Sequence, residues 1–386
     1  MATVRKRRWR AASGEDKTAW VADYFDGACK RHIKTFKTRK AADEWLVNAR
    51  GEVQRGTHTP ENASVSVREA AGLWLSRCEL EGLERSTLRF YRIHVDLHIL
   101  PRVGGEKLSR LTTPRVETFR DDLLRSGVSR ATARKALTTL KSVIADAQRR
   151  GLVAHNAATP VRIDIKRREG GKLVVGRDLP SPAEVQALLS AADGRWRPFF
   201  VTAIFTGLRA SELRGLAWDA ADFDRRVIHV RQRANLWREL GPPKSAAGHR
   251  EIPMSPLVTN TLREWKLACP AGPLCLVFPN TLGKVELHAN IAARAWEPLQ
   301  VAAGLVDADG KPKYGLHSLR HFFASWAIDQ GFSPKKVQAL MGHSGIQITF
   351  DTYGHLFPSL EDDHAKFAAG ELSLVGWDGG IKRPRP

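Results

Sequence analysis

The sequence predicts a multidomain, mainly α-helical protein with two small β-sheets. Its 386 residues give room for two or three domains with sizeable buried cores. The spacing of apolar residues also changes along the chain, from alternation near the start to helical periods over most of the remainder. Segments rich in proline, glycine and small polar residues separate these regions and are typical of linkers.

The charge of the chain limits the classes of partner. Its 61 lysines and arginines exceed its 41 acidic residues, which gives a net charge of +20. A surplus of this size favours a polyanion, because each neutralised phosphate releases condensed counterions. No apolar run approaches the roughly 18 residues of a spanning helix, so we expect no membrane partner. The four cysteines are scattered without a CxxC pair, which fits a reducing cytoplasm.

Residues 1–58 are predicted to form a small sheet covered by one helix. Apolar and aromatic residues alternate with polar ones from about Trp9, and Asp26-Gly27 marks a turn. Residues 40–55 then place apolar side chains at helical spacing. The basic residues up to Arg10 have no apolar stretch behind them, so they do not resemble a secretion signal. A solvated tail stays open as an interpretation of them.

Residues 64–155 carry four stretches of helical spacing, which predict a small bundle. The first stretch covers residues 67–78. In the second, Ser86 is the candidate N-cap, and Pro101 is expected to end the helix near residue 99 because proline lacks the N–H that a helix interior needs.

The third and fourth stretches have clearer boundaries. Thr113 followed by Pro114 forms an N-cap and N1 pair, and Gly127 stops that helix. Ser129 is the candidate N-cap of the fourth helix, which ends near Gly151. Basic residues on and around this last helix are candidates for contacts with DNA, although a solvated helix face would also be basic. They are Arg130, Arg134, Lys135 and Lys141.

Two segments are predicted to lie outside the domains. Residues 156–177 lack sustained periodicity and form the expected interdomain linker, whose basic run at 166–168 could cross a phosphate backbone. Residues 372–386 form a tail with several apolar residues, which could simply pack on their own domain.

Residues 178–371 are predicted to form the largest domain, which is mainly helical with one small antiparallel sheet. A capping box from Ser181 to Glu184 opens its first helix. Residues 226–232 alternate as a strand, and residues 250–253 are the expected second strand of the sheet.

Arg209 lies in a string that suits the binding of an anion. It follows Gly207, which ends a helix at Thr206, and it precedes Ser211, the candidate N-cap of the next helix. Apolar neighbours indicate that its guanidinium is half-buried and needs an anionic partner. Glu212 is either that partner, in a structural ion pair, or a neighbour that orients Arg209 toward a ligand.

His317 and Arg320 are three residues apart and share one side of a helix that starts near His317, where backbone N–H groups also favour an anion. His317 and His321 could instead bind a metal, but no glutamate stands beside His317 and no third ligand is obvious. His321 is expected to be an ordinary helix residue.

A histidine and a tyrosine complete the candidate set. His343 lies just past a helix that ends at Leu340, a place where a histidine alone is usually a cap. Two of the four tyrosines fall in the amino-terminal segments, which leaves Tyr314 and Tyr353 as candidate nucleophiles.

These strings resemble the signature of the tyrosine recombinase (phage integrase) family. The resemblance implies that Tyr353 attacks a DNA phosphodiester, giving a 3′-phosphotyrosyl link and a free 5′ hydroxyl, while Tyr314 is a packing residue. Two arginines neutralise the phosphate, and His343 donates to a non-bridging oxygen. The matching strings are Thr206-Gly207-Leu208-Arg209-Ala210-Ser211-Glu212-Leu213, His317-Ser318-Leu319-Arg320, Leu340-Met341-Gly342-His343-Ser344 and Thr352-Tyr353.

The resemblance also implies roles for other residues. Lys244, in the loop between the two predicted strands, resembles the hairpin lysine that protonates the leaving 5′ oxygen. Glu212 becomes a supporting residue that orients Arg209. Because the covalent intermediate keeps the energy of the broken bond, we expect neither ATP nor a metal nor any other cofactor.

At the level of domains, the resemblance implies an arm-type DNA-binding module at 1–58, a three-stranded sheet with one helix. A SAM-like four-helix core-binding domain at 64–155 and a catalytic domain at 178–371 follow. The expected partner is double-stranded DNA at attachment sites, bound by a homotetramer in which the tail at 372–386 docks on a neighbouring copy. A host DNA-bending factor and an excisionase are further candidate partners, and the cytoplasm of a bacterial host, on its nucleoid, is the expected location.

The expected function is therefore site-specific recombination that integrates or excises a phage or another mobile element. Three alternatives stay open. A type IB topoisomerase relaxes supercoils through the same intermediate, but the arm-like module argues against it. A DNA-binding architectural protein or repressor needs the basic surface but not the complete catalytic set. That set consists of Arg209, Lys244, His317, Arg320, His343 and Tyr353. A metal-dependent nuclease would lose its activity in a chelator.

Overall fold

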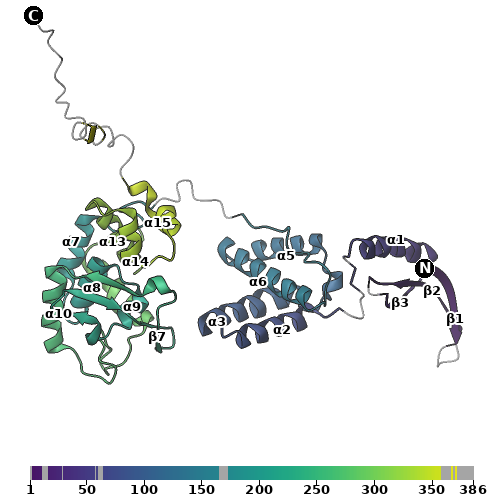
Figure 1. The fold of residues 1–386 in the computed structure, drawn as a ribbon, viewed down its shortest axis with the longest axis horizontal. Coiled ribbons are helices and arrows are strands. Elements are labelled where there is room, and N and C mark those ends of the chain that lie inside the picture. Colours follow the sequence, from purple (N-terminus) through teal and green to yellow (C-terminus); the bar gives the residue numbers. More distant parts are fainter. Residues whose placement is uncertain are drawn as a thin grey trace, which may run out of the picture. The chain divides into compact units, whose positions relative to one another are not determined.

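The computed structural model describes residues 2–10, 16–27, 29–56, 58–59, 64–164, 173–357, 367 and 370–371. They belong to two compact units, residues 1–167 and residues 168–386, and Figure 1 shows both as ribbons coloured along the chain. No helix in these described parts is long and apolar enough to cross a membrane. The basic run at 166–168 and the tail at 372–386 lie outside the described residues, as does much of the segment at 56–64.

The first unit begins with an antiparallel sheet of three strands in the order β1-β2-β3, drawn in purple in Figure 1. The helix α1 packs on this sheet, and the side chain of Thr38 caps its first turn by accepting from the N–H of Ala41. Ala22, Tyr24 and Leu46 form the small core between them. The elements are β1 (Thr3–Arg10), β2 (Asp16–Phe25), β3 (Arg31–Phe36) and α1 (Arg39–Gln54).

The interpretation of a solvated tail before Arg10 is wrong. Residues 3–10 form β1, and each of them pairs with a residue of β2, from Thr3 opposite Asp23 to Arg10 opposite Asp16. Main-chain hydrogen bonds can order an edge strand that has no apolar face, because each of these bonds satisfies a donor and an acceptor of the backbone. Its basic side chains therefore stay exposed while the backbone is ordered.

The rest of the first unit is a helical bundle. Its apolar core is fully enclosed around Trp74, Phe119 and Leu140. Val161 and Ile163 belong to the same core, so the packed part of this unit extends past residue 155, into the segment expected to be a linker. The helical elements are α2 (Val67–Leu80), α3 (Arg85–Ile93), the π-helical turn η1 (His94–Ile99), α4 (Leu100–Val103), η2 (Leu108–Arg110), α5 (Thr113–Arg125) and α6 (Arg130–Arg149).

The second helix of this bundle differs from the prediction at both ends. Glu84, not Ser86, is the N-cap of α3, and it makes no side-chain capping hydrogen bond. Pro101 does not end the helix, because the chain widens into η1 and continues as α4. Arg102 Nη1 donates to the carbonyl oxygens of Leu97 and His98, at 3.5 and 3.1 Å, where the proline offers no N–H.

The start of α5 is shifted by one residue from the prediction. Thr112 is the N-cap, and its hydroxyl accepts from the N–H of Arg115. The hydroxyl of Thr113 instead donates to the carbonyl oxygen of Ala157, a contact that sequence spacing does not show. Ser129 caps α6 as predicted, by accepting from the N–H of Thr132.

The second unit is mainly helical. The capping box from Ser181 to Glu184 opens α7, which confirms that prediction. Gly207 ends α8 in the left-handed conformation. The helices are α7 (Pro182–Ala191), α8 (Trp196–Thr206), α9 (Ala210–Arg214), α10 (Pro256–Ala268), α11 (His288–Ile291), the π-helical turn η5 (Ala292–Trp296), α12 (Glu297–Ala302), α13 (Ser318–Asp329), α14 (Pro334–Met341) and α15 (Ile346–Tyr353), with 3₁₀ turns η3 (Trp218–Ala220), η4 (Ala246–Gly248) and η6 (Gly354–Leu356).

A small antiparallel sheet in the order β4-β5-β8 lies among these helices. Ile228 of β5 pairs with Ile252 of β8, so the two predicted strands are partners. A separate two-stranded hairpin, β6 with β7, follows β5 in the chain. The strands are β4 (Ala221–Asp222), β5 (Val227–Val230), β6 (Arg233–Ala234), β7 (Leu240–Gly241) and β8 (Arg250–Pro253).

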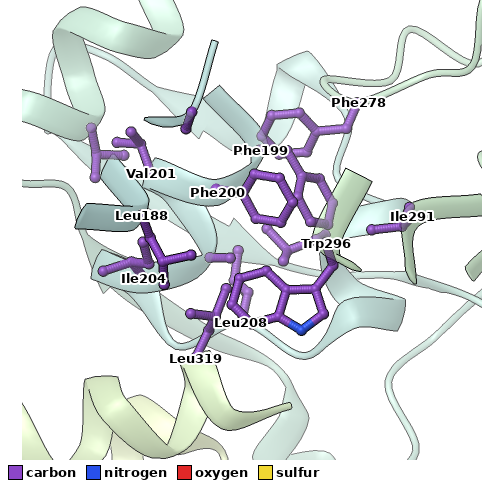
Figure 2. Close-up of a cluster of buried hydrophobic side chains, with 14 of the residues drawn as sticks. Leu188, Phe199, Phe200, Val201, Ile204, Leu208, Phe278, Ile291, Trp296 and Leu319 are labelled. Atoms are coloured by element: carbon purple, nitrogen blue, oxygen red, sulfur yellow. The ribbon is translucent and has the colours of Figure 1, made fainter. Parts of the chain in front are cut away.

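Two apolar clusters hold the second unit together. The larger one centres on α8, and Figure 2 shows Phe199 and Phe200 against Phe278 and Trp296. The aromatic rings of Phe199 and Phe200 meet edge to face, with centroids 5.4 Å apart. The smaller cluster joins α13, α14 and α15, and it contains Tyr353. The last three helices are therefore fixed to each other by their own core.

Candidate active site

Arg209 occupies the first position of the candidate site. It lies between the left-handed Gly207 and the helix α9, and it is the N-cap of that helix. The prediction that Ser211 is the N-cap is wrong, because a carboxylate oxygen of Glu212 accepts from the N–H of Arg209 at 2.8 Å and starts the helix earlier. The same carboxylate accepts from Arg209 Nη1 at 2.8 Å.

Glu212 is a buried carboxylate that two arginines share. Only 3% of its side chain is exposed, and its oxygens accept from both Nη atoms of Arg250, at 3.2 and 2.8 Å. Burial alone would raise the pKa of Glu212, but the hydrogen bonds from Arg250 and the nearby positive charges outweigh it and lower the pKa to about 2. Glu212 is therefore ionised at neutral pH and fixes the guanidinium of Arg209.

Arg250 was not singled out by the sequence, although it lies in the predicted strand β8. Its Nε donates to the carbonyl oxygen of Leu340 at 2.7 Å, so it connects Glu212 to the end of α14. Only 6% of its side chain is exposed. The sequence contained a signal for such a partner. Glu212 lies in an apolar string, and a buried glutamate needs more than one hydrogen-bond donor to stay charged.

Arg320 is the most deeply buried cation of the site. It is 4% exposed, and it donates to the carbonyl oxygens of Gly207, at 2.5 Å, and of Met341. It forms no ion pair with a carboxylate of the described residues. Burial, and secondly the charge of Arg209, lower the pKa of Arg320 to about 9. Arg209 Nη2 donates to the carbonyl oxygen of Gly342 at 2.9 Å, so both arginines meet at the turn after α14.

His317 and His343 are both uncharged at neutral pH. Burial, reinforced by the charges of neighbouring side chains that include Arg320 and Arg209, lowers the pKa of each histidine to about 4. His317 is the N-cap of α13, directly before the turn that carries Arg320. His343 follows the left-handed Gly342, and its Nδ1 lies 3.0 Å from the hydroxyl of Thr349.

Tyr353 ends α15 with only 1% of its surface exposed. Its ring lies parallel to that of His343, with centroids 6.5 Å apart. Burial raises the pKa of Tyr353, and the charge of Arg320 opposes this effect. Tyr314, the other candidate, belongs to the larger core instead, and its hydroxyl donates to Glu184.

His321 contacts the hydroxyl of Tyr353, which the sequence did not predict. Its Nδ1 lies 2.7 Å from the phenol oxygen. His321 lies on α13 as expected, but its contact with the phenol was missed. The useful signal was its spacing from His317, because residues four apart on a helix face the same side. The two histidine rings indeed meet edge to face, with centroids 4.8 Å apart.

Lys244 lies on a neighbouring loop, between β7 and η4, and its side chain is exposed. The turn η4 that follows this loop approaches the turn that carries His343, because a Cβ on Gly342 would lie 2.8 Å from the carbonyl oxygen of Ala247 in η4. Gly342 has a φ of 60°, which also favours glycine. The structure thus brings Arg209, Arg320, His343 and Tyr353 together and holds the Lys244 loop beside them.

The four basic residues of α6 divide into two pairs. Arg130 Nη2 donates to the carbonyl oxygen of Asp164 at 2.9 Å, and Lys141 Nζ donates to that of Thr159 at 3.1 Å. These two side chains therefore fasten the segment after the bundle onto α6. Arg134 and Lys135 line an open hollow between α3 and α6 instead.

Comparisons with known proteins bear on the family and the fold of this chain. Residues 181–359 match the model of the phage integrase family. A XerC-like tyrosine recombinase of Caldanaerobacter subterraneus subsp. tengcongensis is 26% identical over 84% of this chain and 87% of its own length. The ICEBs1 integrase of Bacillus subtilis is 23% identical over 88% of this chain and 93% of its own.

Two solved structures are similar in fold. The Tn1549 transposon integrase in complex with a circular intermediate DNA has a TM-score of 0.64 and 20% identity, over 78% of this chain and 98% of that one. A lambda integrase dimer bound to a core site has a TM-score of 0.58 and 19% identity, over 89% of this chain and 93% of that one.

Proposed function

Because this chain belongs to the tyrosine recombinase (phage integrase) family and is a site-specific recombinase, we propose that Tyr353 is the nucleophile with which it cuts and rejoins DNA. The hydroxyl would attack the phosphorus of a backbone phosphodiester and form a 3′-phosphotyrosyl link. A 5′ hydroxyl from another strand would then reverse the step and join the strands in a new combination.

One observation carries this proposal: Arg320 is buried beside Tyr353, and no carboxylate among the described residues pairs with it. Three guanidinium groups, of Arg209, Arg250 and Arg320, surround the single carboxylate of Glu212. Burying cations in excess is costly unless an anion neutralises them. A phosphodiester brings one negative charge spread over its oxygens, which guanidinium groups bind in a bidentate manner. The excess charge of the site therefore matches the substrate of this reaction.

The other candidate residues have distinct roles in this proposal. Arg209 and Arg320 neutralise the equatorial oxygens while attack and departure stay in line. His317 and His343, which are neutral, donate hydrogen bonds to non-bridging oxygens as the phosphorane forms. Lys244 reaches the leaving 5′ oxygen from its loop and protonates it. Glu212 and Arg250 touch no substrate and keep Arg209 in position.

The proposed partner is double-stranded DNA at attachment sites. The structures of the Tn1549 and lambda integrases contain DNA, and lambda integrase forms a tetramer on a Holliday junction. The charge of +20 supports the same partner for this chain, with the modules at 1–58 and 64–155 binding DNA alongside the catalytic domain at 178–371. A homotetramer on DNA is the proposed assembly, with a host bending factor and an excisionase as further partners.

A nicked suicide substrate, incubated in EDTA, tests this proposal. Once the short strand beyond the nick diffuses away, the covalent protein–DNA adduct accumulates and migrates slowly in a denaturing gel. We expect the adduct with the wild type and none with Tyr353→Phe, which keeps the ring and removes only the attacking oxygen. An adduct of normal yield in Tyr353→Phe would overturn the assignment of the nucleophile.

A further inference from the structure

We propose that His321 is the general base that takes the phenolic proton of Tyr353 as the phenol attacks the phosphate. This inference rests on the proposed function, because it requires Tyr353 to be the nucleophile. It assigns a catalytic part to a residue that the family strings in the sequence do not mark.

Geometry favours His321 over the two other histidines of the site. Its Nδ1 lies 2.7 Å from the oxygen of Tyr353, which is hydrogen-bond distance to the atom that loses the proton. The Nδ1 of His343 is engaged with Thr349 at 3.0 Å, although its ring lies parallel to the phenol. His317 contacts the ring of His321, and within the described parts of the chain it makes no ring contact with Tyr353. Among the described residues, His321 is the side chain that hydrogen-bonds to the nucleophile.

The charges around His321 keep it able to accept a proton. The rings of His317 and Tyr353 contact the imidazole of His321. The charges of Arg320 and Asp178 also act on it. Burial, and secondly the charge of Arg320, lower the pKa of His321, while Asp178 opposes them. The imidazole is therefore neutral at pH 7, and in the tautomer that carries its proton on Nε2 the lone pair of Nδ1 accepts from the phenol. Because burial also raises the pKa of Tyr353, this phenol does not ionise unaided.

The step balances in atoms and charge. The bond from the Tyr353 oxygen to phosphorus forms while the bond from phosphorus to the 5′ oxygen breaks. The phenolic proton passes to Nδ1 of His321, and the leaving 5′ oxygen takes a proton from Lys244. In the reverse step, the attacking 5′ hydroxyl gives its proton to neutral Lys244, and protonated His321 returns its proton to the departing phenol. His321, Lys244 and Tyr353 thereby regain their initial protonation states.

The first experiment compares His321→Asn with the wild type. Asparagine places an oxygen near the position of Nδ1 and can still accept a hydrogen bond, but it cannot take up the proton. We expect single-turnover formation of the adduct to slow by roughly 10²-fold or more, with unchanged binding of the DNA. His229→Asn is the matched control, because His229 lies on β5 and should leave the rate at its wild-type value.

Rescue distinguishes a base from a residue that only positions the phenol. In His321→Ala, added imidazoles should restore part of the rate, and stronger bases should restore more of it. Wild-type or faster rates in His321→Asn, or rescue that ignores base strength, would overturn the inference.

A measurement on the wild type covers the case in which the variants do not fold. With a neutral base in place, the rate should be level from about pH 7 to about pH 9, whereas a phenol that must ionise by itself would give a rate that keeps rising. A continued rise would overturn the inference. Failure of the proposed function looks different, since the wild type would then form no adduct or Tyr353→Phe would still form one.

Discussion

Two buried carboxylates, one in each unit of the molecule, are surrounded by arginines in contrasting ways. Asp146, on α6 of the first unit, pairs with Arg77, Arg149 and Arg150 at 2.7, 3.2 and 2.9 Å. Those three side chains remain between 31% and 60% exposed. Glu212 in the second unit pairs with Arg209, and with Arg250, whose side chain is only 6% exposed.

The difference lies in where the surplus positive charge is placed. Around Asp146 the surplus faces water, which screens it, so the cluster needs nothing more than its own residues. Around Glu212 the surplus is buried, and it includes Arg320, which forms no ion pair with any described carboxylate. A stabilising cluster thus leaves its excess cations in solvent, whereas a binding site holds them in the interior for a ligand that arrives later.

The largest expected effect separates function from stability at Arg320. Arg320→Gln should slow strand cleavage by roughly 10³- to 10⁵-fold, the range for an arginine that stabilises phosphoryl transfer. Its free energy of unfolding should change little, because the variant removes a buried cation that pairs with no carboxylate in the described part of the chain. Single-turnover cleavage and denaturant titration measure the two quantities.

Arg149→Gln is the control from the solvent-facing cluster around Asp146, and it should cleave at the wild-type rate. If Arg320→Gln also cleaved at the wild-type rate, the proposed contrast between the two clusters would be wrong.

The next effect compares the carboxylates themselves. Glu212→Gln should lower the free energy of unfolding by about 3–5 kcal/mol, because it leaves the buried Arg250 without its counter-charge. Asp146→Asn should cost only about 1 kcal/mol, since its arginines turn to water. Urea unfolding of both variants, followed by fluorescence, measures these costs. Equal losses in the free energy of unfolding at the two positions would mean that exposure of the arginines does not determine the effect of removing the carboxylate charge.

The pH dependence of stability sharpens the same comparison. The pKa of Glu212 is about 2 in the folded chain, compared with an ordinary value of 4.5. A lowered carboxyl pKa contributes stability that is present above pH 4.5 and is lost as the pH falls toward about 2. The difference corresponds to about 3 kcal/mol. Measured at pH 5 and at lower values, the stability gap between the wild type and Glu212→Gln should narrow by this amount. A gap that stays constant would contradict the assigned pKa.

The smallest expected effect tests the turn at which the two arginines meet. Gly342→Ala should cost about 2–3 kcal/mol, because the new Cβ adds a contact of 2.8 Å with the carbonyl oxygen of Ala247 to the strain of a left-handed φ. Gly151→Ala, in the first unit, is the matched control. Its φ is 73°, and a Cβ there would meet nothing within 4 Å, so it should cost only about 1 kcal/mol. Thermal unfolding distinguishes them, and equal losses would show that the Ala247 contact is easily relieved.

Much of the site could be predicted because its signals are local. The capping box at Ser181, the glycine that ends α8 and the start of α13 near His317 each depend on residues within one or two turns. The strings that resemble the family are local as well, so Arg209 and Tyr353 could be singled out by number.

The contacts that sequence reasoning missed join residues that are distant in the chain. Arg250 contacts Glu212, and His321 contacts Tyr353, through packing of separate elements that no periodicity encodes. The order of β1 likewise depends on pairing with β2 and not on its own basic composition. Local patterns therefore identified the candidates for the chemistry, while the partners that contact these candidates required the folded chain.

The position of Tyr353 has a consequence during synthesis. Arg209, which precedes α9, and Arg320, on α13, leave the ribosome before α15 does. In a nascent chain that lacks α15 the phenol is absent, so the proposed attack on a phosphodiester cannot take place. On the proposed mechanism, the first cut therefore waits until α15 has been made and has packed against α13 and α14.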